Sequence, residues 1–156
     1  MNRQFYPMFP NNKTLSYPLC FIGIIMVILG IRWLIHPEPW MLDEVANVER
    51  LGMTFEELFD AEINKTLPDY LTQIYRFFGF WVLIVGALIL NLSRPDIIYN
   101  NKKISTIIIY TVGLMMIFGL YLGYSLIPSS HFISLIWVFF IFYLISLYSY
   151  FKLKDL

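Results

Sequence analysis

The chain alternates between long apolar stretches and short connections that carry most of the charged residues. No Asp, Glu, Lys or Arg lies between Lys13 and Arg32, and none lies between Arg76 and Arg94. A helix needs about 20 mostly apolar residues to cross the hydrocarbon core of a bilayer. Each stretch is therefore long enough for one transmembrane helix. The first two predicted spans are 17–36 and 72–92.

A third apolar stretch runs from Ile104 to Phe151 without a charged residue. It is too long for one membrane helix and has the length of two helices joined by a turn. We predict that turn at Pro128–His131, because proline and adjacent serines interrupt helices. The last two predicted spans are 105–127 and 130–151. The pattern thus predicts four transmembrane helices.

The connection between the first two spans, residues 37–71, has a helical pattern of its own. Apolar residues recur at helical spacing from Met41 to Leu51, and Gly52 then interrupts the pattern. Thr54–Glu57 has the sequence of a capping box, which begins a helix. We predict two short amphipathic helices whose apolar faces cover the outer end of the bundle.

The composition agrees with this pattern. The chain is 58% hydrophobic and 14% charged, whereas a soluble domain is about 45–50% apolar and about 25% charged. We therefore predict an all-α integral membrane protein that forms a single membrane domain over 1–156. Its fold is a four-transmembrane-helix bundle with an extracytoplasmic loop of about 35 residues, 37–71, between the first two helices.

Two further counts exclude classes of function. The formal net charge is zero, so no basic surface argues for binding nucleic acid. The single cysteine, Cys20, excludes an intramolecular disulfide framework, a CxxC redox pair and a multi-cysteine zinc site.

The charges are strongly segregated along the chain, and this segregation predicts the orientation. The loop 37–71 carries nine acidic residues and two basic ones. The other connections and the two tails are basic, with Arg3, Lys13, Arg94, Lys102, Lys103, Lys152 and Lys154. Because Lys and Arg favour the cytoplasmic side, we predict cytoplasmic termini and an extracytoplasmic acidic loop. The Ile, Asn and Lys bias favours a bacterial or organellar origin, and we expect a bacterial plasma or inner membrane.

Glycines mark the helix faces that we expect to pack against one another. Membrane helices associate closely where small residues let their backbones approach. Two pairs are seven residues apart, nearly two helical turns, and a third is four apart. These are Gly23 and Gly30, Gly79 and Gly86, and Gly119 and Gly123. We predict packing within the bundle, with a dimer or partner face at Gly119 and Gly123 as the alternative.

Two arginines lie inside the predicted outer boundary, where ionisable residues are energetically unfavourable and often functional. Arg76 falls near the glycine face of its helix, so we expect it to point into the bundle. Arg32 falls nearly opposite its glycine face, so we expect it to point toward lipid, a partner or the loop. Pairing of both with loop acids such as Glu38 or Asp69 is the structural alternative.

The functional alternative is a site for an anionic group, such as a lipid phosphate or a carboxylate. Its candidate residues are Arg32, Arg76, Tyr75 and Trp81. The two histidines, His36 and His131, are both predicted at the outer face, but their spacing matches no metal-binding signature. We therefore expect no metal site and no cofactor.

The spans contain no Asp or Glu, and we find no nucleophile–base pair. The absence of these residues argues against membrane enzymes whose catalysis needs acidic side chains within the membrane. It also argues against exporters that need a carboxylate buried in the membrane. We therefore predict a non-catalytic accessory subunit of a larger membrane complex, with membrane lipids and other integral membrane subunits as partners. A basic extracytoplasmic partner would dock on the loop acids Glu56, Glu57, Asp60 and Glu62. The alternative is a small-ligand or lipid-binding or transport protein with its site near Arg76.

Overall fold

The computed structural model describes residues 13–154, which form helices and turns with no strand among them. The long helices are α1 (Lys13–Ile35), α4 (Leu67–Leu92), α6 (Lys102–Leu126) and α7 (His131–Lys154). All four are long and apolar enough to cross a membrane. The predicted all-α four-helix bundle is therefore confirmed, and the protein is a multi-pass integral membrane protein.

The short elements occupy the connections. The loop between α1 and α4 contains η1 (Pro39–Asp43), α2 (Glu44–Leu51), α3 (Phe55–Asp60) and η2 (Glu62–Asn64), and α5 (Pro95–Ile98) joins α4 to α6. The two loop helices thus follow the apolar pattern and the capping box in the sequence. Pro39 begins the short turn η1, a position where its missing N–H has no helical partner to lose.

Helix α4 begins at Leu67, five residues before the predicted span. Pro68 lies in its first turn, where the missing N–H of proline has no helical partner to lose. The helix therefore continues beyond the apolar stretch into the loop. The first turns of α4 provide a support on which the loop packs.

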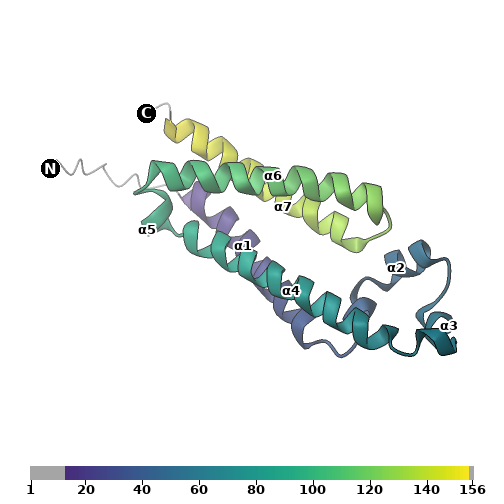
Figure 1. Cartoon of the computed structure of the whole chain (residues 1–156). Helices are drawn as coiled ribbons and strands as arrows, with labels where there is room; N and C mark the ends of the chain where they lie inside the picture. The colour runs from purple at the N-terminus through teal and green to yellow at the C-terminus, as the bar shows by residue number, and fades with distance from the viewer. Residues whose placement is uncertain (1–12, 155–156) are drawn as a thin grey trace.

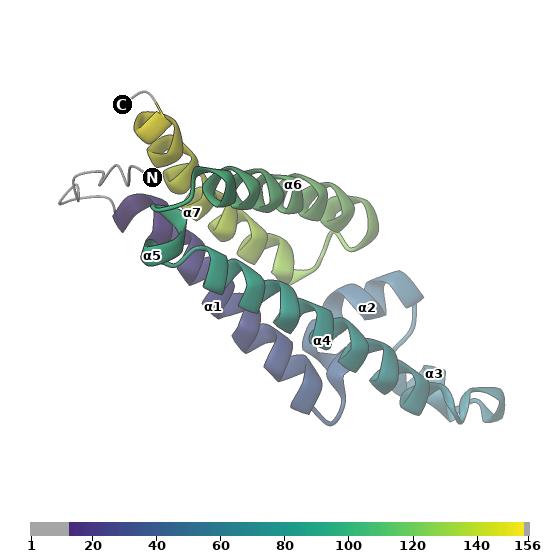
Figure 2. The same cartoon turned by 60° about the vertical axis from the view of Figure 1, so that its left-hand side comes forward.

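The helices form two hairpins, α1 with α4 and α6 with α7 (Figure 1). Helices α4 and α6 lie close together near the start of α1 and diverge toward the other end, where α1 and α7 remain in contact through Trp33 and Phe132 (Figures 1 and 2). Figure 2 shows α2 in the opening between α4 and the α6–α7 turn, as Figure 1 does. We refer to the loop end as the outer end and to the opposite end as the inner end.

The α1–α4 hairpin is held by direct backbone contact at its four glycines. A Cβ added to Gly30 would lie 2.5 Å from the Leu83 nitrogen, and one added to Gly23 would lie 2.7 Å from the Leu90 nitrogen. On α4, a Cβ at Gly79 would lie 2.6 Å from Cβ of Trp33. Any side chain here would force the helices apart, because Cβ contacts of this length do not occur in real proteins.

The third pair of glycines also faces a neighbouring helix. A Cβ on Gly119 would lie 3.7 Å from Ile136, and one on Gly123 would lie 3.2 Å from Ile133. Both isoleucines belong to α7. Gly119 and Gly123 thus lie at the contact between α6 and α7, and the structure does not present them as a partner face.

Six fully buried apolar side chains lie in α1, α5 and α6, toward the inner end; they are Leu15, Leu19, Ile22, Ile98, Ile109 and Val112. Hydroxyl groups join the helices there. Thr14 of α1 bonds Ser149 of α7 at 3.0 Å, and Thr106 of α6 bonds Tyr150 of α7 at 2.8 Å. The inner end is therefore well packed. The Thr14–Ser149 bond joins the two hairpins there, whereas the Thr106–Tyr150 bond holds α6 to α7 within one hairpin.

Candidate functional site at the acidic loop

Hydrogen bonds and aromatic packing hold the acidic loop in a defined conformation. The Thr54 hydroxyl accepts a hydrogen bond from the Glu57 backbone N–H at 3.2 Å, and the Glu57 carboxylate accepts one from the Thr54 backbone N–H at 2.8 Å. This is a complete capping box. Trp40 packs against Phe55 and Phe59 with ring centroids 6.3 and 5.6 Å away. The capping box and the aromatic cluster together hold α3 against η1.

A second set of contacts fastens α2 to α4. The Asn47 side-chain amide donates to the Trp40 carbonyl at 2.8 Å. Its oxygen accepts from the Tyr75 hydroxyl at 3.1 Å. Tyr75 is thus engaged in holding the loop on α4, because both hydrogen-bonding groups of the Asn47 side chain are used.

A third set fastens the loop to the α6–α7 turn. Asp43 is 8% exposed. One carboxylate oxygen accepts from the Ser130 hydroxyl at 2.6 Å, and the other lies 3.2 Å from Nδ1 of His131 as an ion-pair contact without hydrogen-bond geometry. In addition, the Ser129 hydroxyl donates to Glu49. We call these five residues, Asp43, Glu49, Ser129, Ser130 and His131, the outer clamp.

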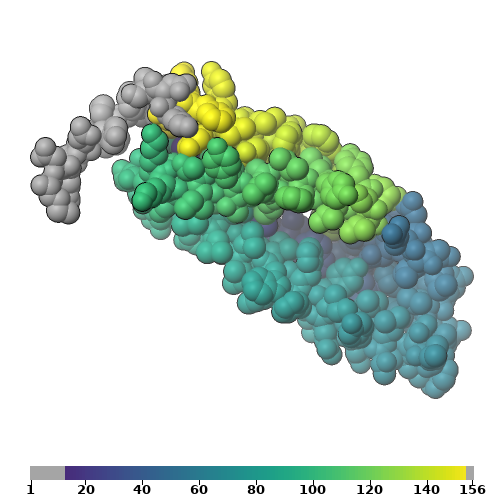
Figure 3. All heavy atoms as spheres, turned by 45° about the horizontal axis from the view of Figure 1, so that its top comes forward, coloured from purple at the N-terminus to yellow at the C-terminus, as the bar shows by residue number. Residues whose placement is uncertain are grey.

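Ser130 also holds the first turn of α7. Its hydroxyl oxygen accepts from the Phe132 backbone N–H at 3.2 Å, which is the geometry of a helix cap. The Asp43 carboxylate therefore lies beside the N-terminus of a long helix, where the helix dipole stabilises negative charge. Phe132 in turn packs against Trp33 of α1 at 4.8 Å between ring centroids. Figure 3 shows the loop, in blue, against the light green end of α6 and α7.

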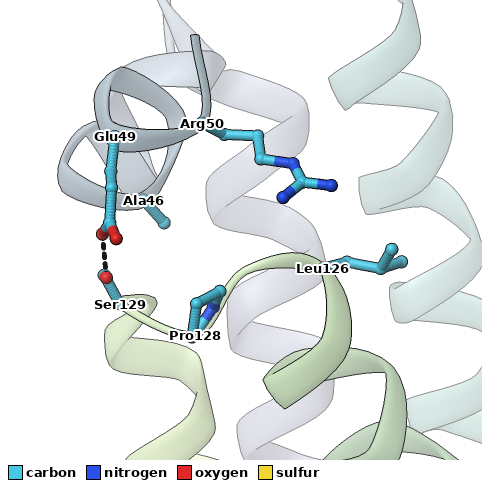
Figure 4. Close-up of a pocket in the computed structure, with 6 residues that line it drawn as sticks. All are labelled: Ala46, Glu49, Arg50, Leu126, Pro128 and Ser129. Carbon is cyan, nitrogen blue, oxygen red and sulfur yellow. Dashed lines mark hydrogen bonds between the residues drawn. The ribbon is translucent and has the colours of Figure 1, made fainter. Parts of the chain in front are cut away.

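A small pocket of about 80 Å³ lies beside the outer clamp; it is lined by Ala46, Glu49, Arg50, Leu126, Pro128 and Ser129. Figure 4 shows the Glu49 carboxylate turned to Ser129 and the Arg50 guanidinium extended to the other side. The pocket is far smaller than the roughly 300–1,000 Å³ of typical ligand pockets. It has room for a few water molecules.

A larger depression, of about 510 Å³, lies near the inner end; it is lined by Lys102, Lys103, Thr106 and Ile107. All four residues belong to the first turns of α6. The depression is an open part of the surface of one helix, and no polar group from another helix converges on it. It therefore lacks the converging groups of a catalytic or substrate-binding site.

The acids predicted to dock a partner lie on and after α3, and all four are exposed. Two of them already have partners. Glu57 belongs to the capping box, and Glu62 forms a salt bridge with Lys65. Glu56 and Asp60 form no salt bridge or hydrogen bond with any residue in the described range 13–154. They are the two acids of this group that are free to meet a partner.

Hydrogen bonds from the Thr54 backbone N–H and hydroxyl lower the pKa of Glu57 below its usual value of 4.5. The carboxylate thus stays ionised at neutral pH. Ile63, close by in sequence, is 90% exposed. The tip of the loop therefore combines fixed negative charge with an uncovered apolar side chain.

The structure does not gather the predicted ligand-site residues into one site. Arg32, Arg76 and Trp81 are exposed, whereas Tyr75 points to Asn47 in the loop. Trp81 makes its aromatic contacts with Phe77 and Phe80 of its own helix. No salt bridge joins either arginine to a residue within 13–154, so pairing with Glu38 or Asp69 is not formed.

Our expectation that Arg76 points into the bundle is wrong. Gly79, one turn further along α4, packs against Trp33, and α1 ends at Ile35. Since the two helices are antiparallel, α1 has already ended at the level of Arg76. No part of α1 remains there to cover the side chain, and the loop helix α2 contacts the neighbouring Tyr75 instead.

The two histidines make different contacts. Nδ1 of His36 accepts from the Glu38 backbone N–H at 3.1 Å, and His131 belongs to the outer clamp. Across residues 13–154, no three His, Cys, Asp or Glu side chains come together as a metal site would require. The pairing of Asp43 with Ser130 and His131 was not predicted, because the partners are more than 80 residues apart and no local pattern links them.

No protein-family model matches this chain, and no curated protein or solved structure matches it.

Proposed function

We propose that this protein is a non-catalytic accessory subunit of a larger membrane protein complex and that its acidic loop docks a basic extracytoplasmic partner. The observation that carries the proposal is the tip of the loop. There, Glu56 and Asp60 are exposed and unpaired within the described residues, on a helix that is itself fixed by a capping box. A surface that is ordered before binding loses less conformational entropy when a partner binds.

The proposal includes an orientation. The acidic loop faces outward and both termini are cytoplasmic, because the basic connections all lie at the other end of the bundle. The membrane would be a bacterial plasma or inner membrane. In this orientation the loop meets partners outside the cytoplasm, and anionic lipid headgroups would be repelled by it.

The chemistry of the loop suits electrostatic docking. Opposite charge across an interface speeds encounter and fixes the orientation of the partner more than it raises affinity. The exposed Ile63 adds a small apolar contact that a basic amphipathic segment could cover. Other integral membrane subunits would contact the lipid-facing sides of the helices, which carry many exposed aromatic side chains.

The test is co-purification of the tagged protein from its own membranes in mild detergent, followed by mass spectrometry. We expect a defined assembly with fixed stoichiometry. The double variant Glu56→Gln and Asp60→Asn should reduce the recovered partner by at least about threefold, because exposed charge pairs each contribute modestly. It leaves both the capping box and the Glu62–Lys65 salt bridge in place.

The matched control is Glu38→Gln with Glu44→Gln. It removes the same charge from two exposed loop acids that lie away from the tip. We expect it to retain the partner. If both double variants lose the partner equally, the tip is not the docking surface; if the wild-type protein purifies alone, the accessory-subunit proposal is overturned.

A further inference from the structure

Arg50 is a positively charged side chain at the small pocket of the outer end. It is exposed, and it forms no salt bridge or hydrogen bond with any residue in the described range 13–154. Leu126 and Pro128 line the same pocket, so the guanidinium lies beside the end of α6 and the following turn. A guanidinium has five N–H donors, which are available here for an anionic group from outside the chain.

A negative charge lies on the other side of the same pocket. Glu49 turns its carboxylate to Ser129, whereas the Arg50 guanidinium extends to the side where Leu126 lies (Figure 4). The Ser129 hydroxyl uses only part of the capacity of that carboxylate, because its two oxygens can accept several hydrogen bonds. The pocket of about 80 Å³ is therefore flanked by one positive and one negative side chain.

The pocket lies at the level of the lipid headgroups. Helices α6 and α7 are both long and apolar enough to cross a membrane, and the turn between them lines the pocket. That turn is where the chain leaves the hydrocarbon core. On the same two helices, the Trp137 indole N–H donates to the Tyr124 hydroxyl at 3.0 Å, and both side chains are exposed. Exposed Trp and Tyr are typical of a membrane interface.

We propose that the pocket between Glu49 and Arg50 binds the headgroup of phosphatidylethanolamine. The guanidinium binds the phosphate through charge-assisted hydrogen bonds, and the Glu49 carboxylate accepts hydrogen bonds from the primary ammonium. The aminoethyl end of this headgroup is no larger than the few water molecules for which the pocket has room. The acyl chains stay in the bilayer beside Leu126, whose side chain is 50% exposed.

Two other phospholipid headgroups match this pair of charges less well. The loop 37–71 carries nine acidic and two basic residues, so it repels phosphatidylglycerol, whose net charge is negative. Phosphatidylcholine is zwitterionic, but its quaternary ammonium is larger and has no N–H to donate. Glu49 therefore distinguishes the primary from the quaternary ammonium, whereas Arg50 binds the phosphate that all three lipids share.

Native mass spectrometry of the purified, delipidated protein in detergent tests the proposal. Each of the three phospholipids, with identical acyl chains, is added at the same concentration, and the fraction of protein that carries a bound lipid is measured. We expect phosphatidylethanolamine to bind at least about threefold more than either of the others, because exposed charge pairs contribute modestly. Equal binding of the three lipids by the wild-type protein would overturn the proposal.

Variants at the two charges separate their roles. Arg50→Gln should lose most of the bound phosphatidylethanolamine, whereas Arg50→Lys, which keeps the charge without the planar set of donors, should retain part of it. Glu49→Gln should bind phosphatidylethanolamine and phosphatidylcholine equally, because the amide oxygen can still accept from Ser129 but carries no charge.

The matched control is Lys65→Gln, which removes a positive charge from the same loop at a residue outside the pocket. It should keep the preference of the wild-type protein for phosphatidylethanolamine. The proposal is also overturned if Arg50→Gln keeps this preference or if Lys65→Gln loses it equally. Because the isolated protein is measured, the result does not depend on the proposed docking function.

Discussion

Gly30 shows how much one residue determines in this bundle. Its α-carbon lies against the α4 backbone, so that an added Cβ would meet the nitrogen and α-carbon of Leu83 and the carbonyl of Gly79 within 2.8 Å. Backbone atoms cannot turn aside as a flexible side chain can. The two helices would have to separate, and every contact along their shared face would weaken.

We therefore predict that Gly30→Ala destabilises the protein by about 1–3 kcal/mol, since overpacking outweighs the gain in helix propensity. Gly119→Ala is the matched control, because its Cβ would lie at an ordinary 3.7 Å from Ile136. It should leave the stability unchanged or raise it slightly. Thermal unfolding in detergent measures both, and an equal loss in the two variants would contradict close packing at Gly30.

At the scale of elements, α3 depends on its cap. It has six residues, too few to be stable alone, so the capping box and the packing of Phe55 on Trp40 must hold it. We predict that Thr54→Ala loosens α3 by about 1 kcal/mol, whereas Thr54→Ser keeps the hydroxyl and the cap. The rate of trypsin cleavage after Arg50 or Lys65 measures the difference; equal rates in the two variants would show that the cap does not hold the loop.

The same cap predicts a dependence on pH. The pKa of Glu57 is lower in the folded loop than its usual 4.5, so the ionised carboxylate stabilises α3 above that pH. This contribution is lost as the pH falls through the lowered pKa. In a variant that retains Trp40 alone among the tryptophans, its fluorescence should report a loosening of the loop below pH 4.5. Thr54→Ala should reduce that acid change, and an undiminished change would assign it to other carboxylates.

At the scale of the whole molecule, the segregation of charge implies one orientation. Ile63, 90% exposed, follows α3, and Asn100, also exposed, follows α5. Helices α3 and α5 lie at opposite ends of the molecule (Figure 1). In a Cys20→Ser background, we predict that a membrane-impermeant maleimide labels Ile63→Cys in intact cells and labels Asn100→Cys only after permeabilisation. Neither substitution removes a Lys or Arg. The reverse labelling pattern would invert the proposed orientation and remove the loop from extracytoplasmic partners.

The sequence by itself determined the four long helices and the two short loop helices of this protein. Charge-free apolar stretches are sufficient to predict the four spans, because the thickness of the bilayer sets how many apolar residues a helix needs. The glycine spacing indicated the face on which α1 and α4 meet, since seven residues return to nearly the same side of a helix. The capping box predicted α3 because its two hydrogen bonds join residues only three positions apart.

The tertiary structure decided where those elements meet. Asp43 was one of nine loop acids in the sequence, and it became the buried one because the docking of η1 brings it to Ser130 and His131. Arg76 is exposed because α1 ends below it, which depends on the register of two packed helices. Contacts across such distances along the chain depend on how whole helices dock. A hydrophobic pattern that repeats every few residues does not specify how those helices dock.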